Sequence, residues 1–197
     1  GVVCVDAPAL APVEAAARLA GCAERFLLHS ASDADGCGRW SFVGANPQAR
    51  LRLPASTSTH PPVPPMMALQ AFASDAGVSE PLGARAAAEL GPVPRIVGFL
   101  SYDLCRHVER LPVLASDDLG LPDLCFARYD AVWRCDHQTG RTHVVGVDEA
   151  AVAWLLGQLD RAEGAGQAGA SSASDAFFPF VALEADTEHV RRIERAL

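Results

Sequence analysis

The residue types best suited to bind a small molecule lie between Ser30 and Trp40. Ser30 ends the segment RFLLHS and Arg39 begins the segment RWSFV, so a hairpin would bring a hydroxyl, a guanidinium and an indole together at its mouth. The backbone of Cys37 and Gly38 would lie beside them. An amino acid needs acceptors, donors and an apolar slot, and Ser30 with nearby carbonyls could be the acceptors. The alternative is structural, with Ser30 capping a turn and Arg39 on the surface.

The other reactive side chains show no catalytic or metal-binding spacing. All sixteen basic residues are Arg, and the absence of Lys excludes a Lys nucleophile, Schiff base or general base. His107 lies near Asp103 and Glu109, but adjacent helix positions mostly face water, so we expect a solvated face. Four other histidines lie in unrelated segments: His60, His137, His143 and His189. We therefore expect no catalytic residue and no metal site in this chain.

Composition restricts the possible partners. The 197 residues carry a formal charge of −8 without a basic run, so we expect neither nucleic acid nor an anionic membrane as a partner. Apolar stretches stay shorter than a membrane span, and the first residues lack the pattern of a signal peptide. The six cysteines form no C-x-x-C pair, and we expect them to be reduced and mostly buried. A single cytoplasmic domain is the expectation.

The stretch Ile96–Pro112 organises the elements around it. Ile96–Leu100 is apolar except for Gly98, which predicts a buried strand with another backbone close by. Leu104, Val108 and Leu111 then recur at helical spacing, and Pro112 ends that helix. Further predicted strands are Val2–Val5, Phe26–Leu28 (buried), Arg39–Val43, Ala49–Leu53 (half-exposed), Leu124–Cys135, Val144–Val147 and Phe177–Leu183. Further predicted helices are Pro12–Leu19, Met66–Ala73, Leu82–Leu90, Glu149–Arg161 and one starting at Asp186.

These elements predict an α+β fold in which antiparallel sheets are covered by helices. Two hairpins support antiparallel pairing, and the second has the clearest turn in the sequence, Asp136–Gly140. Pro54–Pro65 is rich in Ser, Thr and Pro and predicts an extended loop. Ala162–Asp175 is composed of small residues and predicts a flexible linker or disordered loop.

Several short motifs follow one another in a fixed order: Gly98, Tyr102-Asp103-Leu104, Glu109-Arg110-Leu111-Pro112, Pro122-Asp123 and Tyr129-Asp130. In this order they resemble the amino-terminal part of the chorismate-utilising synthases, that is, aminodeoxychorismate synthase component I and anthranilate synthase component I. The resemblance covers most of Arg25–Leu53 and Ile96–Val147, with a weaker match over Phe177–Leu197. It implies that the fold is half of a layered α/β/β/α arrangement with two sheets packed near-orthogonally.

The resemblance also implies a tryptophan-binding site in this chain. Its residues would be Ser30, Cys37, Gly38, Arg39 and Trp40. His29 stands where anthranilate synthases typically carry Glu, which favours the aminodeoxychorismate type. Cys37-Gly38 departs from the bulkier pair often found there, and the family completes the pocket with residues from its other half. We therefore expect low affinity for tryptophan in this chain.

By the same resemblance, the parent protein aminates chorismate to 4-amino-4-deoxychorismate for folate synthesis. A glutamine amidotransferase subunit supplies ammonia, and glutamates of a chorismate-binding half bind Mg²⁺. None of that half's motifs is present, so we expect this chain to be inactive alone and to self-associate through uncovered apolar sheet. Alternatives are the amino-terminal regulatory domain of anthranilate synthase component I, a stand-alone aromatic amino-acid-binding module, and a structural domain without a ligand.

Overall fold

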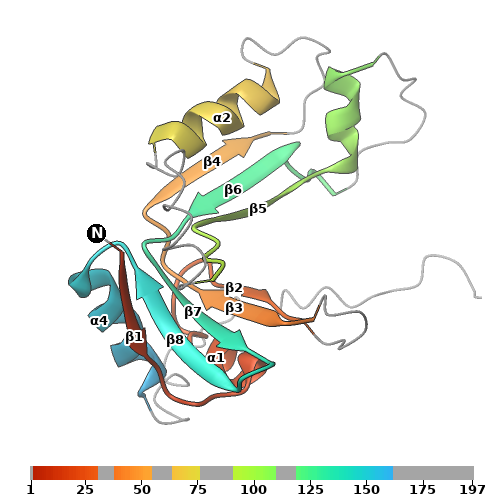
Figure 1. The fold of residues 1–197 in the computed structure, drawn as a ribbon. Helices are drawn as coiled ribbons and strands as arrows, with labels where there is room; N and C mark the ends of the chain where they lie inside the picture. Colours follow the sequence, from red (N-terminus) through yellow and green to blue (C-terminus); the bar gives the residue numbers. More distant parts are fainter. Residues whose placement is uncertain (1, 31–37, 55–63, 76–90, 110–118, 162–197) are drawn as a thin grey trace, which may run out of the picture. The chain divides into compact units, whose positions relative to one another are not determined.

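The computed structural model describes residues 2–30, 38–54, 64–75, 91–109 and 119–161 (Figure 1). The chain divides into two compact units, Gly1–Glu163 and Gly164–Leu197, and the second lies outside the described residues. Several predictions also fall outside them: Cys37, most of the loop Pro54–Pro65, the helix Leu82–Leu90, the linker Ala162–Asp175, the strand Phe177–Leu183 and the helix from Asp186.

Five strands form the larger sheet, in the order β1-β8-β7-β3-β2. Every neighbouring pair in this sheet is antiparallel, which confirms the prediction of antiparallel pairing. The strands are β1 (Val3–Asp6), β2 (Phe26–Leu28), β3 (Trp40–Gly44), β7 (Ala131–Asp136) and β8 (Arg141–Gly146). The predicted hairpin turn joins β7 to β8, and Gly140 there has a φ of +68°, a conformation that glycine adopts without steric cost.

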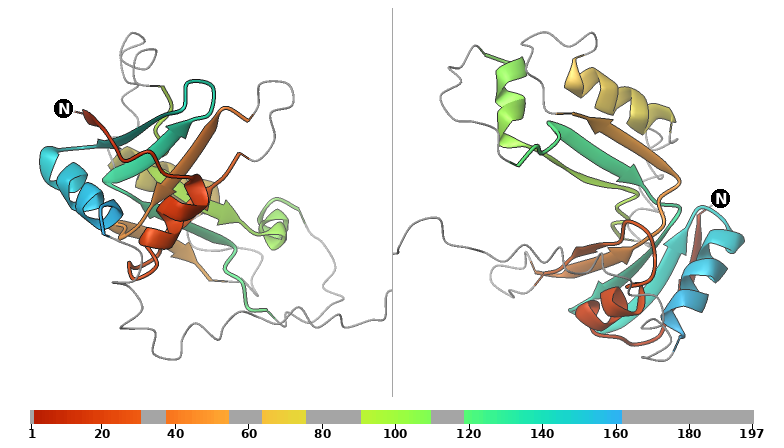
Figure 2. Two further views of the ribbon diagram at one scale, coloured as in Figure 1. Left: turned by 90° about the horizontal axis from the view of Figure 1, so that it is seen from below. Right: turned by 180° about the vertical axis from the view of Figure 1, so that it is seen from behind.

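Helices α1 (Pro12–Arg18) and α4 (Glu149–Leu159) cover one face of this sheet (Figures 1 and 2). Pro12 starts α1 at a position where a missing N–H costs nothing. The carboxylate of Asp148 accepts a hydrogen bond from the amide of Ala151 at 2.8 Å and so caps α4. The core between helices and sheet consists of Ala15, Leu19, Val43, Ala45, Ala131, Trp133, Cys135, Val144, Val152, Leu155 and Leu159.

A three-stranded antiparallel sheet has the order β4-β6-β5. Its strands are β4 (Ala49–Leu53), β6 (Leu124–Arg128) and β5 (Ile96–Leu100). Helix α2 (Pro65–Asp75) packs against β4 (Figure 1). Side chains of β4 alternate between half-buried and exposed, as predicted. The packing of the two sheets as half of an α/β/β/α arrangement stays a prediction.

Strand β5 corrects one prediction and confirms another. It pairs with β6 along one edge, and Phe99 and Leu100 are each 45% exposed, so the prediction of a buried strand is wrong. The close backbone approach at Gly98 is confirmed, because an added Cβ would overlap the carbonyl oxygen of Cys125 and lie 2.6 Å from the Cα of Phe126. The same correction applies to β2, where Leu27 and Leu28 are exposed beside β3 at the end of the larger sheet.

Two further predicted elements differ in the structure. The segment Leu124–Cys135 has the predicted β structure but is divided into two strands, because the chain passes from β6 in one sheet to β7 in the other at Tyr129-Asp130. The Tyr129 hydroxyl donates to the carbonyl of Glu24 at 2.9 Å, which holds this crossing point. The predicted helix after Ser101 is a short 3₁₀ helix, η2 (Tyr102–His107), which buries no residue completely.

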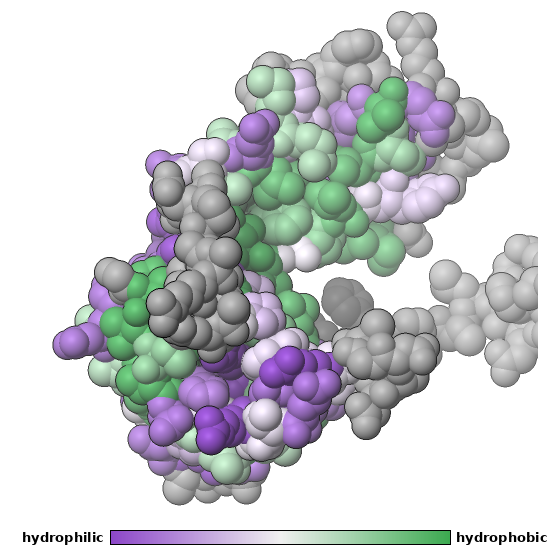
Figure 3. Space-filling view, viewed as in Figure 1, coloured by the Kyte–Doolittle hydropathy of each residue, from purple (hydrophilic) through white to green (hydrophobic). Residues whose placement is uncertain are grey.

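Apolar side chains remain exposed on the described surface. Figure 3 shows hydrophobic residues gathered over the three-stranded sheet. The exposed large side chains of this region include Phe99, Leu100, Tyr102, Val108, Leu119 and Leu121. Self-association through such a surface stays a prediction. Among the residues that the structure describes, we find no helix with the length and apolarity to cross a bilayer.

Candidate functional site

The predicted hairpin brings Ser30 to Trp40. Strands β2 and β3 pair with Leu28 opposite Phe42. Beyond this pair, the Ser30 amide donates to the Ser41 hydroxyl at 3.0 Å, and the Ser30 hydroxyl donates to the Trp40 carbonyl at 2.6 Å. Both bonds fix the backbone at the end of the hairpin. The Ser30 hydroxyl proton is therefore engaged, while its oxygen keeps lone pairs that can accept a hydrogen bond.

A surface pocket opens at this point of the hairpin. Its volume is about 410 Å³, it is open to solvent, and it is lined by Leu28, His29, Ser30, Trp40 and Phe42. Small-molecule sites generally measure about 300–1,000 Å³ and combine an apolar lining with a few polar groups. The Trp40 and Phe42 rings stack with centroids 6.5 Å apart and planes 17° apart. The arrangement offers an aromatic surface beside a hydroxyl and an imidazole.

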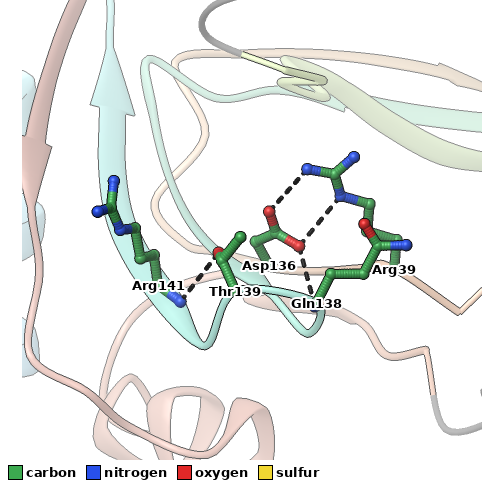
Figure 4. A network of polar contacts seen from close by, with 5 residues as sticks. All are labelled: Arg39, Asp136, Gln138, Thr139 and Arg141. Atoms are coloured by element: carbon green, nitrogen blue, oxygen red, sulfur yellow. Dashed lines mark hydrogen bonds and ion pairs between the residues drawn. The ribbon is translucent and has the colours of Figure 1, made fainter.

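Arg39 lies beside the pocket but is engaged by Asp136 (Figure 4). Its Nε and Nη2 donate to the two carboxylate oxygens at 3.1 and 2.8 Å, and the register of β3 and β7 places Trp40 opposite Asp136. The hydrogen bonds from Arg39 hold the pKa of Asp136 at about 2, against burial, which would raise it. The amide of Gln138 adds a third bond at 3.0 Å. The charge of Arg39 is thus largely balanced within the protein.

A second arginine contacts the same indole. The guanidinium carbons of Arg39 and Arg134 lie 4.7 and 5.3 Å from the centroid of the Trp40 ring, which is within the range of cation–π attraction. Arg134 is only 4% exposed, and burial lowers its pKa. Its Nε and Nη1 have no hydrogen-bond partner in the structure as described. Arg134 is not among the site residues predicted from the sequence, although a lone Arg within the apolar strand AVWRCD indicates a buried charge.

A polar cluster supports the hairpin from within. The buried Ser41 hydroxyl lies 2.7 Å from Nε2 of His137, and the Cys135 sulfur lies 3.9 Å from Nδ1 of the same ring. The ring of His29 is 6.4 Å from that of His137, centroid to centroid. The sequence did not indicate this contact of His137, because it depends on the pairing of β3 with β7, which joins two segments about 96 residues apart.

The remaining predicted site residues have different positions. Gly38 lies in a turn before Arg39, and Cys37 is outside the described residues. The expectation of a solvated His107 is wrong, since its side chain is 8% exposed and its Nε2 lies 2.7 Å from a carboxylate oxygen of the buried Asp123. The described cysteines are all free thiols, as expected, but the expectation that they are mostly buried is wrong, because Cys135 is buried and the others are half-buried. In the described ranges, no group of three or more metal-ligating side chains occurs.

Comparisons with known proteins identify homologues of this chain. Anthranilate synthase component 1 of Mycolicibacterium smegmatis is 38% identical over 120 residues, which cover 58% of this chain and 23% of that protein. Anthranilate synthase component 1 of Thermus thermophilus is 50% identical over 50 residues, covering 25% of this chain and 11% of that protein. Aminodeoxychorismate synthase component 1 of Bacillus subtilis is 38% identical over 69 residues, covering 33% of this chain and 15% of that protein.

These relatives are much longer than the aligned region. The chain spans about a quarter or less of the length of each of them. No family model matches the chain.

Proposed function

We propose, from the homology of this chain to anthranilate synthase component 1 and aminodeoxychorismate synthase component 1, that it is part of a chorismate-utilising synthase. In this proposal the chain supplies scaffold and a tryptophan pocket, and the reacting groups belong to parts of the protein outside it. The observation that carries the proposal is the pocket, in which Ser30 and Trp40 come together in a chain with these homologues.

The pocket supplies two kinds of contact for an aromatic amino acid. The stacked rings of Trp40 and Phe42 offer an apolar face to an indole. The oxygen of Ser30 can accept from the ammonium group, because its own proton is directed to the Trp40 carbonyl. The pocket is open on one side, so a ligand keeps much of its solvent contact here. We therefore expect a dissociation constant in the millimolar range for this chain, about 4 kcal/mol of binding free energy.

An NMR titration of the 197-residue chain with L-tryptophan tests the pocket. We expect progressive shifts of the amide signals of Ser30 and Trp40 and of the Trp40 indole, and no shifts with L-alanine at the same concentrations. Ser30→Ala should weaken binding several-fold, whereas Ser74→Ala, on the exposed side of α2, should not. Absence of shifts at 10 mM tryptophan would refute the pocket. Micromolar affinity would instead favour a stand-alone amino-acid-binding module.

The product that we propose for the whole protein is 4-amino-4-deoxychorismate, formed with ammonia from a glutamine amidotransferase subunit and with Mg²⁺. His29 supports this choice, since it stands where a Glu is typical of anthranilate synthases. Anthranilate synthesis is the second candidate, because the relative of that name from Mycolicibacterium smegmatis matches a longer stretch than the aminodeoxychorismate relative, 120 residues against 69.

An assay with chorismate and ammonium separates the two candidates. The longer protein that we propose should yield para-aminobenzoate after addition of the lyase, whereas an anthranilate synthase gives fluorescent anthranilate directly and is slowed by tryptophan. The 197-residue chain assayed alone should form neither product. Turnover by this chain alone would overturn the assignment of the chemistry to other parts of the protein.

A further inference from the structure

Two arginines contact the ring of Trp40, and they differ in how their charge is balanced. Arg39 gives two hydrogen bonds to the carboxylate of Asp136. Arg134 lies on the same strand as Asp136, yet its Nε and Nη1 are buried without a hydrogen-bond partner in the described structure. An arginine side chain is normally buried only when it is paired, because desolvation of the charge is costly. Arg134 is therefore the buried cation near the pocket whose Nε and Nη1 lack a hydrogen-bond acceptor, although the carboxylate of Asp136 attracts its charge.

The sheet register places Arg134 next to the lining of the pocket. Phe42 lies directly opposite Arg134 in the pairing of β3 with β7. Opposite residues of an antiparallel pair project from the same face of the sheet, so Arg134 shares a face with Phe42 and with Trp40, two residues earlier. Both aromatic rings line the pocket. The guanidinium of Arg134 therefore lies on the same face of the sheet as two residues that line the pocket.

The backbone of Gly91 packs closely against Arg134 and Trp40. A Cβ added to Gly91 would lie 3.2 Å from Nη1 of Arg134 and 3.1 Å from the nearest atoms of the Trp40 ring, which is closer than an ordinary van der Waals contact. The φ of Gly91 is +68°, which disfavours any other residue there. A side chain at this position would therefore crowd both the guanidinium and the indole. Hydrogen bonds between guanidinium and carboxylate are among the strongest in proteins.

We propose that Arg134, and not Arg39, binds the carboxylate of the amino acid in the pocket, with Nη1 as the donor. This inference rests on the proposed tryptophan pocket and names the anion-binding group that the pocket lacks. Since Arg134 is 4% exposed, the ligand reaches it only when a side chain packed on it moves. Trp40 is the residue that both lines the pocket and contacts the guanidinium, so its ring shifts on binding to expose the guanidinium and remains in the pocket wall beside Phe42.

The test compares ligands that differ by one charged group. Wild-type chain is titrated by NMR with L-tryptophan, with tryptamine, which lacks the carboxylate, and with indole-3-propionate, which lacks the ammonium. We expect the two carboxylates to bind roughly 10- to 100-fold more tightly than tryptamine, the range for one charge-assisted hydrogen bond. Arg134→Met should abolish this preference and leave tryptamine binding unchanged. Arg134→Lys should retain part of it, because the charge remains.

The matched control is Arg50→Met, which removes a half-exposed arginine on β4 that pairs with Glu24. It should leave the preference for carboxylates as in wild type. Thermal unfolding of each variant shows whether it is folded. If Arg134→Met does not fold, the preference for carboxylate ligands over tryptamine is compared between wild type and Arg134→Lys, and this comparison still shows whether Arg134 binds the carboxylate.

Each pattern of results has a distinct meaning. An unchanged preference in Arg134→Met, or a wild type that binds tryptamine as tightly as tryptophan, overturns the role of Arg134 while the pocket stands. Binding of indole-3-propionate without binding of tryptophan supports Arg134 and overturns the amino-acid pocket. A wild type that binds none of the three ligands overturns both.

Discussion

Replacement of Asp136 by Asn tests the electrostatic account of the hairpin. The carboxylate is 6% exposed and receives two hydrogen bonds from Arg39 and one from the amide of Gln138. A pKa of 3.8 in the unfolded chain and about 2 in the folded chain corresponds to about 2 kcal/mol of stabilisation at neutral pH. Because Arg39 is 41% exposed, solvent screens the pair, and we expect Asp136→Asn to cost about 1 kcal/mol.

The pH dependence has a definite sign. The pKa of Asp136 is lower in the folded chain, so its contribution is complete above the unfolded pKa of 3.8 and disappears as pH falls towards about 2. Urea denaturation of wild type and variant, followed by circular dichroism, should therefore give a difference that is constant from pH 7 to 5 and shrinks between pH 4 and 2. At pH 7 the midpoint of thermal unfolding should fall by about 2–4 °C.

A matched control is Asp103→Asn, which removes an exposed Asp–Arg pair formed with Arg106 within η2. Exposed pairs contribute little, so this change should cost less than about 0.5 kcal/mol at every pH. Equal losses for Asp136→Asn and Asp103→Asn, or a loss for Asp136→Asn that persists unchanged at pH 2.5, would refute the reasoning.

Substitutions at two glycines and at Asp148 test the packing of β5 and the capping of α4. Gly98→Ala should destabilise the chain by about 2 kcal/mol or more in urea denaturation, since the new Cβ overlaps the Cys125 carbonyl, whereas Gly157→Ala in α4, with open space around it, should stabilise by roughly 0.5–1 kcal/mol. A tolerated Gly98→Ala would show that β5 and β6 separate easily. Asp148→Ala should cost about 1 kcal/mol, because the amide of Ala151 loses its acceptor, and Asp148→Asn should restore most of the stability; equal losses for both would contradict the capping role.

The sequence by itself determined the local elements of this protein. Periodicity and end signals predicted α1, α4 and the strands of the larger sheet, because a helix or strand is set by residues close in sequence. The turn Asp136–Gly140 and the close approach at Gly98 were likewise predicted, since both depend on the absence of a side chain at one glycine. The ordered motifs between Ile96 and Asp130 indicated a resemblance to anthranilate synthase component I and aminodeoxychorismate synthase component I, and homologues of this chain carry these names.

Only the tertiary structure decided burial and electrostatic pairing. An apolar run such as Ile96–Leu100 has the same composition in a central strand and at the edge of a sheet, so its exposure depends on which strands lie beside it. The same holds for charge: Arg39 and Asp136 are 97 residues apart, and the register of β3 with β7 joins them. The same register gives Arg39 a carboxylate partner and leaves Nε and Nη1 of Arg134 without a hydrogen-bond acceptor, which no spacing in the sequence reveals.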